Sequence, residues 1–191
     1  APVAPAVGGA RGGSVQVVGL GPPVRPPAAA PRGGTTGVLA TAGSRKTSRC
    51  ADLLERFGQE IEVVTQSAPG LVEQVEAGDL RGPQTRSLVK QYTAPLPRAG
   101  ADPIVLGCTH YPCLRPLIQE VVGPGVTLID TGAAVARQVR RVLQENGLIA
   151  GDGQAAAEQF WTSGDAAHGE TVASRLWGSP LRVQPLPVGV A

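Results

Sequence analysis

Methionine is absent from the 191 residues, and so is any continuous apolar run long enough to cross a bilayer. Because a membrane-spanning helix needs about 18 or more consecutive apolar residues, no membrane span is expected. Prolines interrupt every apolar stretch near the start, so the unbroken apolar core of a secretory signal is missing too. The lack of an initiating methionine leads us to expect a fragment of a longer protein.

Charge and thiols are also scarce. The 17 basic and 15 acidic side chains are scattered and leave a net charge of +2, so no basic face for nucleic acid is expected. Three cysteines, an odd number without a signal, indicate a reducing compartment and hence a cytoplasmic location. No Gly-x-Gly-x-x-Gly sequence opens a helix and no phosphate-binding loop is present, so we predict no cofactor.

Glycine and proline are the abundant residues, at 26 and 18, and many of them lie in residues 1–35. That segment has no acidic and no aromatic residue. Its side chains are too small to offset an ordering entropy of about 1–2 kcal/mol per residue. We therefore interpret residues 1–35 as a low-complexity segment and expect it to lack a packed core.

From residue 36 the composition becomes that of a globular α/β domain. Short apolar runs predict strands at Thr36–Thr41, Ile61–Val64, Ile104–Leu106 and Val126–Ile129. Helices are predicted between these strands, at about 44–57, 69–78, 82–92, 112–122 and 131–146. Strands and helices that alternate in this way favour a mostly parallel sheet with helices on both faces, an αβα sandwich.

The segment Ile104–Cys113 concentrates the reactive side chains. Asp102-Pro103 is expected to close the preceding segment, and Pro112 fits the first turn of a helix. Cys108, Thr109 and His110 should therefore lie between the carboxyl end of a strand and the start of a helix. Open α/β sheets bind their ligands at that edge, and the free N–H groups of a helix end favour a carboxylate.

Two other interpretations of this segment have to be weighed. A single cysteine after a strand is usually a small core residue, and a single histidine is usually structural. Metal binding would use Cys108, His110 and Cys113, but zinc sites usually add a second cluster. The remaining candidates, Cys50 and His168, lie in remote segments, so we predict no metal.

The run Gly107-Cys108-Thr109-His110-Tyr111-Pro112 resembles the signature of the glutamate racemase family, within the wider aspartate/glutamate racemase group. Other segments resemble the family in the same order along the chain: 15–20, 37–41, 68–78, 130–132 and 160–165. The resemblance implies a parallel-sheet αβα sandwich with one complete domain and a remnant of the other. Residues 1–35 would be the remnant, 36–150 the domain with the Cys108 motif, and 151–191 a tail that completes the first domain in the family.

The same resemblance implies inversion at the α-carbon of an amino acid without a cofactor. Cys108 would be one of two cysteine acid/bases, His110 would orient it or exchange a proton with it, and Glu76 would assist His110. Thr109, His110, Thr41 and Ser44 would bind substrate. Thiols suit this reaction because an ordinary thiol pKa of about 8.5, lowered modestly, supplies both base and acid near neutral pH.

The family's first catalytic cysteine would fall at or before Ala1, and the opening residues contain neither cysteine nor asparagine. We therefore expect a glutamate racemase chain that is truncated and inactive by itself, from a protein that supplies D-glutamate for peptidoglycan. A related aspartate racemase, or a non-catalytic remnant that binds a dicarboxylate or a protein, is the alternative. The expected partners are glutamate and, as one option, a second copy of the chain.

Overall fold

The structure is a computed structural model that describes residues 34–41, 62–130, 132–149, 151 and 157–187, and the backbone of 7–8 and 14–15. The short strands β1 (Val7–Gly8) and β2 (Ser14–Val15) pair antiparallel. Most of the segment expected to lack a packed core, and the whole of the helix expected at 44–57, lie outside the described residues. In the described part of the chain, no helix has the length and apolar character needed to cross a bilayer.

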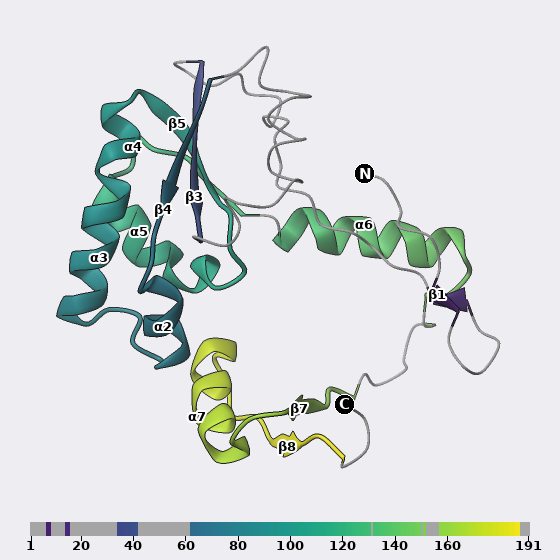
Figure 1. Ribbon diagram of the computed structural model, residues 1–191. Helices are drawn as coiled ribbons and strands as arrows, with labels where there is room; N and C mark the ends of the chain where they lie inside the picture. Colours follow the sequence, from purple (N-terminus) through teal and green to yellow (C-terminus); the bar gives the residue numbers. More distant parts are fainter. Residues whose placement is uncertain are drawn as a thin grey trace.

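A parallel four-stranded sheet forms the centre of the fold (Figure 1). Its strands, in spatial order, are β4 (Glu62–Ser67), β3 (Thr35–Ala40), β5 (Ala101–Leu106) and β6 (Leu128–Ile129). Each neighbouring pair runs parallel. The α/β fold with a parallel sheet is therefore confirmed.

Strand β5 begins earlier than the sequence indicated. We expected Asp102-Pro103 to close the preceding segment, and this was wrong, because β5 includes both residues. Ala101 and the next apolar positions are buried, which favours strand pairing from Ala101 onward. Since Pro103 has no N–H to donate, the pairing with β3 is irregular there, between Thr35 and Gly37.

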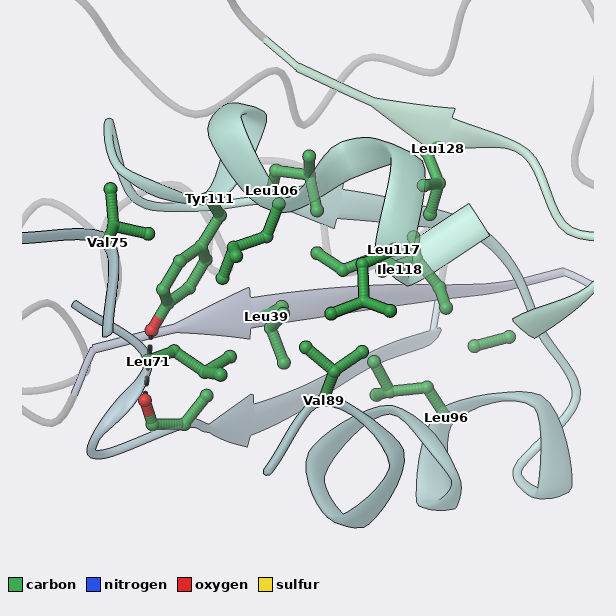
Figure 2. Close-up of a cluster of buried hydrophobic side chains, with 14 residues drawn as sticks. Leu39, Leu71, Val75, Val89, Leu96, Leu106, Tyr111, Leu117, Ile118 and Leu128 are labelled. Atoms are coloured by element: carbon green, nitrogen blue, oxygen red, sulfur yellow. Dashed lines mark hydrogen bonds between the residues drawn. The ribbon is translucent and has the colours of Figure 1, made fainter. Parts of the chain in front are cut away.

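Helices on one face of the sheet enclose the main hydrophobic core. They are α2 (Leu71–Glu76), α3 (Pro83–Thr93), α4 (Pro95–Arg98), the 3₁₀ helix η2 (Tyr111–Leu114) and α5 (Arg115–Val122). Figure 2 shows their side chains meeting those of the strands in one cluster: Leu39, Leu71, Val75, Val89, Leu96, Leu106, Tyr111, Leu117, Ile118 and Leu128. Helix α6 (Gly132–Glu145) extends away from the sheet (Figure 1).

The spacing of buried side chains explains why α3 packs as it does. Thr85, Val89 and Thr93 recur every fourth residue and are all fully buried. Pro83 occupies the first turn of α3, where its missing N–H costs nothing. The Asp79 carboxylate accepts hydrogen bonds from the N–H groups of Gly82 and Arg81, which stabilises the start of the helix.

The tail forms a small unit of its own. Strands β7 (Phe160–Thr162) and β8 (Val183–Pro185) pair parallel, with α7 (Ala166–Trp177) between them, which makes a βαβ unit. These two strands make a sheet that is separate from the four-stranded one. Trp161 and Trp177 are 44% and 56% exposed, so much of the apolar surface of the tail is left uncovered.

Candidate active site

Cys108, Thr109 and His110 follow β5 at the carboxyl edge of the sheet, in what we call the reactive loop. Because Leu39 pairs with Leu106, Thr41 and Cys108 each lie two residues beyond a matched position on adjacent parallel strands. Strand register alone therefore brings Thr41 and Cys108 to the same level of this edge. Thr41 is half-buried, as is Cys108.

Gly107 allows the chain to leave β5 in close contact with β3. Its N–H donates to the Leu39 carbonyl at 2.8 Å. A Cβ atom at this position would lie 2.9 Å from that carbonyl oxygen and 3.3 Å from the Val38 side chain. Any larger residue would push the two backbones apart, so glycine is required immediately before Cys108.

Tyr111 anchors the other end of the reactive loop. Its side chain is fully buried, and its hydroxyl lies 3.2 Å from the Ala40 carbonyl and 3.3 Å from the Ala68 carbonyl. Ala40 is the last residue of β3 and Ala68 directly follows β4, so one hydroxyl ties the loop after β5 to the ends of two other strands. Burial, with a smaller contribution from the nearby Cys108, raises the pKa of this hydroxyl far above its usual value.

Cys108, His110 and Glu76 form a connected series. The Cys108 Sγ lies 3.7 Å from His110 Nδ1, and His110 Nε2 lies 2.5 Å from a Glu76 carboxylate oxygen. Glu76 is the last residue of α2, 34 positions before His110. The structure thus brings together the three residues that the family resemblance proposed as catalytic.

The hydrogen bond to Glu76 determines how the His110 ring is used. An ionised carboxylate can only accept hydrogen bonds, so Nε2 carries the hydrogen and donates it. The neutral ring then has its acceptor nitrogen, Nδ1, facing the Cys108 thiol at 3.7 Å and the Thr109 hydroxyl at 3.5 Å. A ring oriented in this way can take a proton from the thiol and return it.

Cys113 differs from Cys108 in its surroundings. It lies in η2, and burial raises the pKa of its thiol, which disfavours the reactive thiolate. Both cysteines are free. Among the described residues, no group of three or more His, Cys, Asp or Glu side chains is arranged to hold a metal ion.

An ion pair borders the next strand along this edge. Arg115, the first residue of α5, donates to an Asp130 carboxylate oxygen at 2.7 Å and to the Leu128 carbonyl at 2.9 Å. The other Asp130 oxygen accepts the N–H of Gly132 at the start of α6. This pair joins the start of α5 to the end of β6.

One predicted site residue has no description in the structure. Ser44 lies outside the described residues, so its predicted substrate contact stays a prediction. Tyr111 belongs to the Gly107–Pro112 motif, but no role was predicted for it from the sequence. Its acceptors lie 71 and 43 positions away, and no local pattern identifies such distant carbonyls.

Comparison with known proteins identifies the family to which this chain is similar. A sequence model of the family described as Asp/Glu/Hydantoin racemase matches residues 14–139. The chain is 51% identical to a glutamate racemase of Pseudomonas aeruginosa (strain UCBPP-PA14) over 174 residues, 91% of this chain and 65% of the relative. The chain therefore spans about 65% of the length of this curated relative.

Solved structures of glutamate racemases have a similar fold. Glutamate racemase isoform RacE1 from Bacillus anthracis superposes with a TM-score of 0.71 at 28% identity, over 84% of this chain and 60% of that one. An Escherichia coli glutamate racemase in complex with L-glutamate and the activator UDP-MurNAc-Ala gives a TM-score of 0.63 at 28% identity. That alignment covers 80% of this chain and 57% of the E. coli chain.

Proposed function

Because this chain belongs to the Asp/Glu/Hydantoin racemase family, we propose that it carries one face of the active site of a cofactor-independent glutamate racemase. The observation that supports this most is the series from the Cys108 thiol through the His110 ring to the Glu76 carboxylate. A core cysteine would not need an oriented imidazole beside it. The named glutamate racemases among the relatives support glutamate as the substrate.

The proposed reaction begins at Cys108. His110 Nδ1 accepts the thiol proton, and the resulting thiolate removes the α-proton from one face of the amino acid. The electron pair of the broken C–H bond stays on the substrate as a carbanion, and Cys108 becomes a thiol. A second acid must then protonate the opposite face of the α-carbon to complete inversion.

Neighbouring residues would hold the substrate. The exposed Thr109 offers a hydroxyl and a backbone N–H to the α-carboxylate, and Thr41 lies at the same level of the sheet edge. Ser44 is proposed as a further substrate contact on the family resemblance alone. Supply of D-glutamate for peptidoglycan, a cytoplasmic location and a homodimer belong to the same proposal.

Isotope exchange separates proton removal from inversion. The purified 191-residue chain is incubated with each enantiomer of glutamate in heavy water, and the products are followed by chiral chromatography and mass spectrometry. The sequence has three cysteines, and Cys108 is the one within the family motif. Since each acid or base group contributes about 10²–10⁴-fold, we expect α-proton exchange with one enantiomer and inversion near background.

Matched variants make the test specific. Cys108→Ser should abolish exchange, whereas Cys113→Ser should retain it, because burial raises the pKa of the Cys113 thiol. The Pseudomonas aeruginosa racemase serves as the positive control for inversion. Efficient D-glutamate formation that disappears in Cys108→Ser would contradict the one-face proposal and indicate a second acid in this chain.

The exchange experiment, combined with a calorimetric titration of glutamate into the same chain, distinguishes the alternative functions. Glutamate binding without any exchange would favour a non-catalytic remnant that retains a dicarboxylate site. Faster exchange with aspartate than with glutamate, in parallel reactions, would favour a related aspartate racemase.

A further inference from the structure

The tail meets α2 through Arg175. The guanidinium Nη1 donates to the Gly78 carbonyl at 2.7 Å, which joins positions 97 residues apart. A Cβ atom at Gly78 would lie 3.1 Å from the same Nη1, so the guanidinium lies directly against the glycine backbone. Figure 1 shows α7 next to the end of α2.

Gly78 terminates α2 in a specific way. It has a positive φ of 72°, its N–H donates to the Val75 carbonyl, and the Asp79 N–H donates to the Gln74 carbonyl. This pair of hydrogen bonds is the Schellman motif, which satisfies the last carbonyls of the helix itself. The Gly78 carbonyl lies beyond that turn, and Arg175 supplies its donor.

Glu76 extends from the same turn. It is the last residue of α2, two positions before Gly78, and its carboxylate accepts the hydrogen bond from His110. The Glu76 side chain is 66% exposed, so packing does little to hold it. Its position therefore depends on the backbone from which it extends, at the turn that Arg175 holds from outside.

The charged groups around this turn are few in the described part of the chain. Asp79 follows Gly78, and its pKa is lowered first by the Gly82 N–H and to a smaller degree by Arg175. Cys108 and Thr109 face the other side of the His110 ring. Arg175 contacts the turn and none of the residues proposed to react, so its effect on them would pass through the backbone.

We propose that Arg175 is a positioning residue that sets where Glu76 meets His110, by holding the Gly78 carbonyl at the end of α2. This inference rests on the proposed roles of Cys108, His110 and Glu76. The tail would then contribute to the site, because Arg175 of α7 orients the His110 ring through the Gly78 turn and Glu76.

The test uses the full 191-residue chain and two readouts. The ¹⁵N signals of the imidazole rings report which His110 nitrogen carries hydrogen, and the sequence has just one other histidine, His168. The rate of Cys108 alkylation by iodoacetamide, resolved by peptide mass spectrometry across pH 6–9, reports the thiolate. Cys113, whose pKa is raised by burial, provides an internal reference on the same peptide map.

Four variants separate the contributions. Glu76→Ala removes the partner of His110 and defines the full effect. Arg175→Met keeps most of the side-chain length without the donor, and Arg175→Lys restores a donor. Arg182→Met removes one positive charge from an exposed position elsewhere in the tail. The His168 signal, from the first turn of α7, checks that the helix stays folded.

We expect Glu76→Ala to mix the His110 tautomers and to slow Cys108 alkylation about tenfold, the lower end of the effect of losing a hydrogen bond to a charged group. Arg175→Met should change the same signals in the same direction and slow alkylation about threefold, because its effect passes through the backbone and not through a direct contact. Arg175→Lys should recover most of the wild-type rate, and Arg182→Met should match the wild type.

The failures are distinguishable. If Glu76→Ala changes both readouts and Arg175→Met changes neither, the inference about Arg175 is overturned and the proposed function stands. An equal effect of Arg182→Met would overturn it as well, because the cause would then be net charge. If Glu76→Ala itself has no effect, the proposed relay fails, and the role of Arg175 fails with it.

Discussion

Replacing Tyr111 by phenylalanine tests how the reactive loop is held. The substitution keeps the buried ring and removes the hydroxyl that bonds the Ala40 and Ala68 carbonyls at 3.2 and 3.3 Å. The Ala40 carbonyl retains the Ala68 N–H at 3.0 Å, so the main loss is one hydrogen bond at a buried site. We expect the free energy of unfolding to fall by about 1–2 kcal/mol.

Urea denaturation followed by far-ultraviolet circular dichroism measures this loss. The matched control is Tyr92→Phe, because Tyr92 is half-buried in α3 and its hydroxyl makes no hydrogen bond within the described part of the chain. The control should stay within about 0.5 kcal/mol of the wild type. A Tyr111→Phe variant as stable as the wild type would refute the anchoring role.

The pH dependence gives a second, independent check. Burial raises the Tyr111 pKa in the folded state, so an unfolded chain loses this proton near pH 10 while the folded chain keeps it. The stability that Tyr111 contributes is then fully present below about pH 10 and is lost progressively as the pH rises further. Tyr111→Phe should show a shallower alkaline loss of stability, and an unchanged slope would contradict this reasoning.

Two further predictions concern backbone geometry and acid stability. Gly107→Ala should destabilise the chain by about 1–3 kcal/mol, because its Cβ would lie 2.9 Å from the Leu39 carbonyl oxygen, whereas Gly125→Ala, with open space around it, should not. For Asp79, hydrogen bonds from Gly82 and Arg81 lower the pKa, so its contribution is present above the unfolded pKa and lost as the pH falls through the folded one. Asp79→Asn should therefore flatten the acid limb of a denaturation profile relative to Glu158→Gln, and an equal slope in both variants would count against this.

The local elements of the racemase domain could be read largely from the sequence. Alternating apolar segments with Gly and Pro at their boundaries predicted β3, α3 and the loop after β5, because these signals act over a few residues. Boundaries were less well predicted. Strand β4 was expected at Ile61–Val64 but spans Glu62–Ser67. Its polar residues Thr65–Ser67 continue as strand because they pair with Val38–Ala40 of β3, a partner that local propensity does not reveal.

The sequence by itself determined which reactive groups the candidate site contains: a thiol, a hydroxyl and an imidazole in consecutive positions after a buried strand. Family resemblance added Glu76 as the partner of His110. Only the tertiary structure decided that these two side chains meet across 34 positions, that Tyr111 ties three strand ends together, and that Arg175 reaches Gly78. Such contacts depend on how the sheet and its helices pack, because parallel strands bring residues from distant crossovers to one edge.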